Sequence, residues 1–261
     1  MKNRARLIQI FYELKIIASL TARNIKIKYK NTWLGFIWVL LQPLCTIAIL
    51  YFIFSHVIRL DIENFPFFLC AGVLPWTFFA SALTEATSSI LVNSNLVLKV
   101  NFPREILPLT YCLSNLFDFL FSLLILLIIY ACVGIFISPL AIVYLLLIIF
   151  LHFLFVYGFS MVLSILHVFY KDVGHLLSIV LMFWFYLTPI FYAREHVPKS
   201  FQAWYEINPM THFVSSYRAL LFEGSFPEVY TVVKVSASAV LTFCLGYAYF
   251  ISQEKKVAKE L

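Results

Sequence analysis

The sequence predicts an all-α integral membrane protein with six transmembrane helices, an amino-terminal amphipathic interface helix and re-entrant helices before the last span. Hydrophobic residues make up 62% of the 261 residues and charged residues only 12%, whereas a soluble domain carries roughly 25% charged residues. The mean hydropathy is +0.92. Uncharged stretches long enough for a span of about 20 residues recur along the chain. We therefore treat residues 1–261 as a single transmembrane domain.

Residues 1–30 form the predicted interface helix. Leu7, Ile10, Phe11 and Leu14 follow helical spacing, and basic residues lie among the other positions. The segment is too charged to span a membrane, and a basic amphipathic helix of this kind usually lies in the headgroup boundary. Docking on a partner protein is the alternative.

The six predicted spans are residues 31–58, 64–85, 106–134, 140–170, 173–193 and 229–251. Residues 31–58 contain no charged residue, and Gln42-Pro43 should kink this helix. Gly134 and Ser138-Pro139 supply a turn between the third and fourth spans.

The basic residues predict the orientation. Most lysines and arginines gather in the segments that lie inside if the amino terminus is inside, which places both termini in the cytoplasm. The net charge of +6 therefore reflects topology, and we expect no nucleic-acid partner.

Residues 93–105 form a short amphipathic knuckle between two spans. Asn93, Ser94 and Asn95 suit a helix start, and Phe102 is pushed out of helical geometry by the proline that follows it. Pro103 suits the first position of the next helix, with Glu105 near its positive end. A compact knuckle on the cytoplasmic surface is a suitable contact point for a soluble partner.

Residues 194–228 lie outside in this topology but are rich in apolar and aromatic residues. They are too few for two crossings, so we expect half-helices that enter the membrane and return, separated at Pro209. A folded extracellular loop that caps the bundle is the alternative.

Polar groups inside the spans are few. Asp118 lies within the third span, where a charge should face the bundle interior or water, with Ser114 or Asn115 as possible partners. Structural pairing and conduit lining are equally compatible with this position. The cysteines and histidines show no metal-ligand spacing, so we predict no metal site.

The chain contains no phosphate-binding loop, because its seven glycines do not fit the required spacing. We therefore expect no catalytic residues and no cofactor in this chain.

Aromatic residues make up 18% of the sequence and suggest a conduit in which ring faces stack against sugars. An interfacial aromatic belt is the alternative for any single ring. The candidate conduit-lining residues are Trp33, Phe36, Trp38, Asp118, Phe183, Trp184, Tyr186 and Tyr192.

An ordered series of short motifs carries a resemblance to a known family. The motifs are KYKNTWLGFIWVLLQP (28–43), GVLPWTFFA (72–80), FPREILPL (102–109), FYKDVGHLL (169–177), FWFYLTPIFY (183–192) and NPM (208–210). In this order they resemble the permease subunit of ATP-binding-cassette polysaccharide exporters, the Wzm/TagG type that moves O-antigen, capsule or teichoic-acid chains.

The resemblance implies a homodimer joined by two ATPase subunits, with ATP and Mg on the partner, in the bacterial inner membrane. The cargo would be a lipid-linked polysaccharide. Residues 93–105 would form the coupling helix, contacting the ATPase through Asn95, Leu96, Leu98, Lys99, Phe102, Pro103, Arg104 and Glu105. Residues 194–228 would carry the re-entrant gate helices, and the implied periplasmic gate residues are Pro189, Trp204, Asn208, Pro209, Tyr217 and Arg218.

Two other functions remain compatible with the sequence. One is a permease for a small lipid or drug. The other is a membrane-embedded sugar-phosphate transferase, although such chemistry needs convergent carboxylates and usually a metal.

Overall fold

The described part of the chain consists of helices joined by short non-helical segments, and it contains no β-strand. The computed structural model describes residues 2–59, 62–100, 102–193 and 197–260. Its helices are α1 (Lys2–Tyr29), α2 (Trp38–Phe52), α3 (Phe65–Thr87), α4 (Ser89–Val92), α5 (Ser94–Lys99), α6 (Ile106–Val133), α7 (Pro139–Phe169), α8 (Val173–Tyr186), α9 (Lys199–Ile207), α10 (Pro209–Leu221) and α11 (Val229–Glu260). The predicted all-α membrane class is confirmed.

Five segments among the described residues are long and apolar enough to cross a membrane. They are Gly35–Val57, which contains α2 and a helical turn at each end, and the helices α3, α6, α7 and α11. The predicted fifth span, residues 173–193, corresponds to α8, which has only 14 residues and ends at Tyr186. The chain after Tyr186 is not helical as far as Ala193, and it contains Pro189, which cannot continue a helix ladder.

Local sequence explains several helix ends. Gly134 adopts a left-handed conformation (φ 86°) after α6, and the Ile135 amide donates to the Tyr130 carbonyl at 2.8 Å, which closes the helix as a glycine C-cap does. Ser138 then caps α7 by accepting a hydrogen bond from the Ala141 amide at 3.1 Å. The predicted turn between these helices therefore lies where the sequence placed it.

The start of α6 differs slightly from the expectation. Pro103 does not open the helix, which begins at Ile106. Instead, the Ile106 and Leu107 amides donate to the carbonyls of Pro103 and Arg104, three residues back, at 3.2 and 3.0 Å. A tight turn thus precedes α6, because these bonds have the spacing of a 3-10 turn rather than an α-helix.

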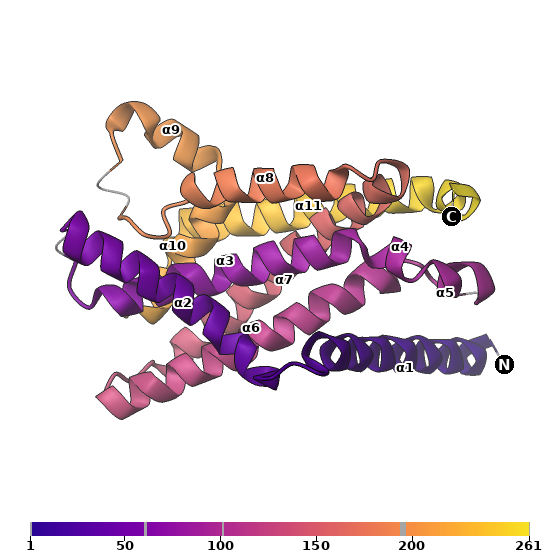
Figure 1. Cartoon of the computed structure of the whole chain (residues 1–261), viewed down its shortest axis with the longest axis horizontal. Helices are drawn as coiled ribbons and strands as arrows, with labels where there is room; N and C mark the ends of the chain where they lie inside the picture. The colour runs from indigo at the N-terminus through magenta and orange to yellow at the C-terminus, as the bar shows by residue number, and fades with distance from the viewer. Residues whose placement is uncertain (1, 60–61, 101, 194–196, 261) are drawn as a thin grey trace.

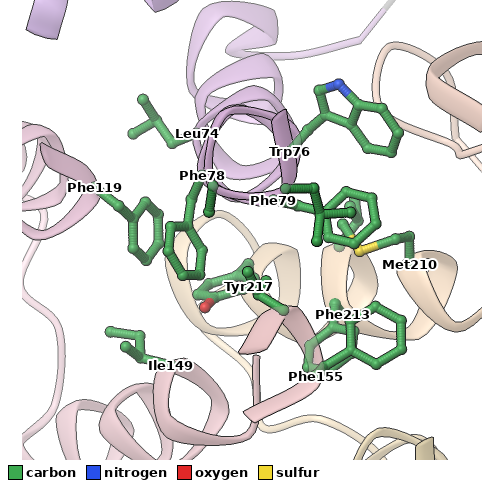
Figure 2. Packing of buried hydrophobic residues seen from close by; sticks show 14 of the residues in the cluster. Leu74, Trp76, Phe78, Phe79, Phe119, Ile149, Phe155, Met210, Phe213 and Tyr217 are labelled. Atoms are coloured by element: carbon green, nitrogen blue, oxygen red, sulfur yellow. The ribbon is translucent and has the colours of Figure 1, made fainter. Parts of the chain in front are cut away.

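Helix α3 lies at the centre of the bundle and packs on α2, α6, α7 and α10. Figure 2 shows Phe78 and Phe79 of α3 facing rings from three other helices: Phe119 of α6, Phe155 of α7, and Phe213 and Tyr217 of α10. Aromatic pairs of this kind pack edge-to-face or offset and add stability beyond their buried area.

The long helices α7 and α11 make the most extensive helix contact among the described residues. Gly158 and Gly246 lie at their crossing, where a methyl group on Gly158 would come within 2.5 Å of the Thr242 carbonyl oxygen. Small residues allow this close approach of two backbones, as is common for helices in membranes.

Candidate functional site

The predicted functional segments lie at opposite ends of the molecule. Figure 1 shows α4, α5 and both chain termini at one end, whereas α9 lies at the other end. A polar cluster and its cavity lie between α1, α2, α3 and α6, between these two ends.

The knuckle is anchored by Asn93, between α4 and α5. Its side-chain amide donates to the Ser89 carbonyl at 2.7 Å, and its oxygen accepts from Arg23 of α1 at 2.6 Å. The Asn93 side chain does not cap α5, contrary to the capping role that the sequence suggested. It connects the knuckle to the amino-terminal helix instead.

The eight predicted coupling residues divide into exposed and packed groups. Asn95, Leu98 and Lys99 are exposed, and Leu98 is 56% exposed although it is apolar. Leu96, Phe102, Pro103, Arg104 and Glu105 are half-buried. The exposed tip of α5 is therefore the part of the knuckle that a partner can contact.

The packed residues tie the knuckle to two further helices. Arg104 donates to the Glu254 carbonyl of α11 at 2.7 Å, and Tyr157 of α7 donates to the Glu105 carbonyl at 3.2 Å. Burial raises the pKa of the Glu105 carboxyl above its ordinary value, and the nearby carboxylates of Glu254 and Glu13 add to the effect. The knuckle is therefore hydrogen-bonded to α1, α7 and α11.

The polar cluster is centred on Lys28, at the carboxyl end of α1. Its ammonium group lies 2.8 Å from Glu85 of α3 and 2.9 Å from Asp118 of α6, and it donates to Asn115 at 2.9 Å. Asn115 also donates to Glu85 at 2.7 Å. Burial lowers the pKa of Lys28, but the attraction of Glu85 and Asp118 outweighs it, so the net pKa is raised.

The predicted partners of Asp118, Ser114 or Asn115, are not the ones that it has in the structure. Asp118 accepts from Lys28 and, at 2.8 Å, from Tyr29 of α1, whereas the Ser114 hydroxyl donates to the Tyr111 carbonyl. Lys28 and Tyr29 are functional candidates that sequence reasoning missed. Lys28 lies 90 positions before Asp118, so no local pattern predicts that the two side chains meet. The one sequence feature that pointed to Lys28 was its position at the end of a predicted amphipathic helix.

The cluster borders a cavity of about 340 Å³ lined by α1, α2, α3 and α6. Of the predicted conduit residues, Trp38 and Asp118 line it. Trp33 is 96% exposed and does not line it, and Phe36 packs against Tyr29, Phe117 and Phe121.

A larger groove of about 1110 Å³ lies between α8 and α9. It brings together predicted conduit and gate residues: Phe183, Trp184, Tyr192, Trp204, Asn208 and Pro209. Tyr186 does not line this groove and is exposed elsewhere on α8. From the sequence, these residues were expected in two separate places, some lining the conduit and others forming the gate.

Asn208 holds the elements of this groove together. Its oxygen accepts from the Trp184 indole at 2.8 Å and from the Met210 amide at 3.0 Å, which caps α10. Its amide donates to the Leu187 carbonyl at 3.2 Å and the Thr188 hydroxyl at 3.1 Å. The predicted helix break at Pro209 therefore falls where the structure has it, with α9 before it and α10 after it.

The remaining predicted gate residues are buried. Arg218 donates to the carbonyls of Pro189 and Ile190 at 3.0 and 3.1 Å and lies 3.6 Å from the centre of the Phe68 ring. Tyr217 is fully buried in the aromatic core. These side chains fix α10 to the segment after α8 and do not line the groove.

Comparison with known proteins extends over nearly the whole chain. Residues 16–222 match the family described as ABC-2 type transporter. The chain is 30% identical to an O-antigen export system permease protein RfbA of Klebsiella pneumoniae, over 96% of each protein. It is 27% identical to a protein of the same name from Myxococcus xanthus, over 98% of this chain and 99% of that one. It is 21% identical to the polysialic acid transport protein KpsM of Escherichia coli, over 92% and 93%.

Proposed function

Because the chain belongs to the ABC-2 type transporter family, we propose that it is the channel-forming permease subunit of an ATP-driven polysaccharide exporter. Its cargo is a lipid-linked polymer, such as O-antigen, capsule or a teichoic-acid-like chain, that crosses the bacterial inner membrane. The observation that carries this proposal is the end-to-end similarity to two O-antigen export permeases, since it includes every helix of the bundle rather than one motif.

The proposed assembly is a homodimer joined by two ATPase subunits that bind ATP and Mg. The exposed tip of α5, residues Asn95, Leu98 and Lys99, seats on the ATPase. This places α5 and both termini in the cytoplasm, in agreement with the concentration of basic residues in these segments. The ties from the knuckle to α1, α7 and α11 then carry the movement of the ATPase into the bundle.

The proposed membrane topology has six crossings. Helix α8, at about 1.5 Å per residue, is shorter than the roughly 30 Å hydrocarbon core. We assign the fifth crossing to α8 together with the non-helical segment up to Ala193. Backbone carbonyls of that segment accept hydrogen bonds from the Arg218 and Asn208 side chains, so they need no helix and no water. Helices α9 and α10 then form the re-entrant gate at the outer end.

The coupling role is tested with Leu98→Ser. Leu98 is 56% exposed, so the change should leave the fold intact and weaken association of the ATPase. Val92→Ser is the matched control, because Val92 is an exposed apolar residue of α4 outside the tip of α5. Phe102 is a poorer choice, since it packs against the core. Equal ATPase binding and export in both variants would remove the coupling role.

Transport itself is tested in vesicles that contain this chain and its ATPase. ATP-dependent movement of a glycolipid into the lumen is the expected result. Movement of a small lipid or drug without any glycolipid transport would favour the alternative permease function.

A further inference from the structure

The cavity beside the Lys28 cluster has the lining of a ligand site. It measures about 340 Å³ and lies between the end of α1, the start of α2, and the middle of α3 and α6. This volume is at the lower end of the range for small-molecule sites, about 300–1,000 Å³. Trp38 and Gln42 are exposed at its edge, whereas Asn115 and Phe119 are buried within it.

Negative charge is in excess beside this cavity. One ammonium group, that of Lys28, faces two carboxylates, those of Glu85 and Asp118. Asp118 Oδ2 accepts two hydrogen bonds, but Asp118 Oδ1 is buried and has no hydrogen-bond partner among the described residues. A buried carboxylate oxygen without a partner is costly, and a ligand that donates a hydrogen bond removes this cost.

Two hydroxyl groups of the lining, those of Thr77 and Ser122, can accept a hydrogen bond from a ligand. Thr77 donates its proton to the Val73 carbonyl at 2.8 Å, and Ser122 donates to the Asp118 carbonyl at 3.0 Å. Because these protons are already used, only the oxygen lone pairs remain for a ligand. Together with the excess negative charge, this lining favours a neutral donor and disfavours an anion.

Aromatic rings complete the lining. Trp38 is exposed at the edge, and the buried rings of Phe78 and Phe119, which also line the cavity, stack on each other with their centroids 5.4 Å apart. Flat apolar faces beside a small number of placed polar groups are typical of small-molecule sites. Sugars fit such a lining, since they present C–H faces to the rings and hydroxyl donors to the acceptors.

We propose that this cavity binds one neutral, hydroxyl-rich sugar unit of the exported polymer, which donates hydroxyl hydrogen bonds to Asp118 Oδ1 and Thr77 Oγ1. This inference rests on the proposed function, because it assigns the cavity to the polymer cargo. It adds a chemical preference: the site takes neutral sugars and rejects acidic sugars and phosphate groups, which narrows the proposed cargo to polymers with neutral sugar units and excludes a teichoic-acid-like chain. Lys28 positions Asp118 and leaves one of its oxygens for the sugar.

The test is saturation-transfer NMR on the full chain in detergent micelles, with the methyl glycosides of glucose, galactose, mannose and N-acetylglucosamine as probes. Methyl glucuronide is the anionic probe. We expect at least one neutral glycoside to bind and the glucuronide to show no transfer. Thr77→Val, which keeps the shape but removes the oxygen, should weaken neutral binding about three- to tenfold, as expected for the loss of one hydrogen bond.

Thr84→Val is the matched control. Thr84 lies on the same helix and donates to the Ala80 carbonyl at the same 2.8 Å, but it is exposed and does not line the cavity. The inference is overturned if no neutral glycoside binds, if the glucuronide binds equally well, or if the two valine variants behave alike.

The vesicle assay separates this inference from the proposed function. ATP-dependent glycolipid movement without any glycoside binding to the chain overturns the sugar site and leaves the export function standing. Glycoside binding without glycolipid movement overturns the export function, and the cavity then remains a sugar site of another protein class.

Discussion

Among single residues, Lys28 connects charged groups of three helices. It bridges carboxylates on two helices and lies within 2.9 Å of both. Pairing of buried charges is worth little when compared with an apolar core, but removing one partner leaves the other charge uncompensated. The cluster therefore fixes where α1 meets α3 and α6.

Lys28→Met should destabilise the protein by about 1–3 kcal/mol. This is less than the roughly 3–5 kcal/mol lost when one partner of a fully buried ion pair is removed, because the Lys28 and Glu85 side chains are 29% and 32% exposed. Thermal unfolding of the purified chain measures the change. Lys26→Met, at an exposed position on the same helix, is the control. The triple change Lys28→Met, Glu85→Gln and Asp118→Asn should recover part of the loss, and identical melting of the two lysine variants would contradict the role of the pair.

Glu105 gives a pH-dependent prediction. Its pKa is raised in the folded protein, mainly by burial, so the folded state binds the proton more tightly than the unfolded state does. The carboxylate therefore costs no stability below its unfolded pKa, and the cost grows as the pH rises from there through the folded pKa. Glu105→Gln should raise the melting temperature at pH 8 and leave it unchanged near pH 4.

The control for Glu105 is Glu63→Gln, at an exposed carboxylate between α2 and α3. This variant should have the same melting temperature as the parent at pH 8, because the Glu63 side chain is exposed. A Glu105→Gln variant that is less stable than the parent at pH 8 would show that the carboxylate is favourable in the folded state.

At the scale of elements, the α7–α11 crossing depends on two glycines. A methyl group on Gly246 would overlap the Gly158 carbonyl, and one on Gly158 would meet the backbone of Thr242. Gly158→Ala should therefore separate the helices and cost about 1–3 kcal/mol, the usual range for overpacking. Thermal unfolding checks this, with Leu245→Ala, at a 61% exposed position, as a control that should change little.

The elements also show where local pattern is sufficient. Runs of residues without charge correctly predict where α2, α3, α6 and α7 lie. A helix in lipid must form all its backbone hydrogen bonds internally, so its position follows from the apolar run. The helix within the predicted fifth span is shorter than that span: α8 ends at Tyr186, although residues 187–193 also contain no charged residue. Hydrogen bonds from Asn208 and Arg218, both distant in sequence, satisfy that segment without a helix.

At the scale of the whole molecule, the knuckle and the groove between α8 and α9 face opposite ends. The proposed topology therefore gives a labelling prediction in a background without the native cysteines. Trp204→Cys should react with a membrane-impermeant maleimide in intact cells, and Lys99→Cys should react only in inverted vesicles. Both positions are exposed in the chain by itself, and the test uses the chain without its ATPase, because that subunit would cover Lys99. Labelling of both from the same side would contradict the topology.

Composition, hydropathy and charge bias along the chain were sufficient to predict the membrane class, most helix positions and the short helix of the knuckle, and the ordered motifs were sufficient to predict the family. Hydropathy, proline and glycine positions and the charge bias act over a few residues, so they can be read along the chain. Only the tertiary structure decided that Asp118 pairs with Lys28 and Tyr29, that Tyr217 and Arg218 are packed inside, and that Trp184 and Trp204 share one groove. Those contacts join helices that are far apart in sequence, and the packing of side chains between helices selects them.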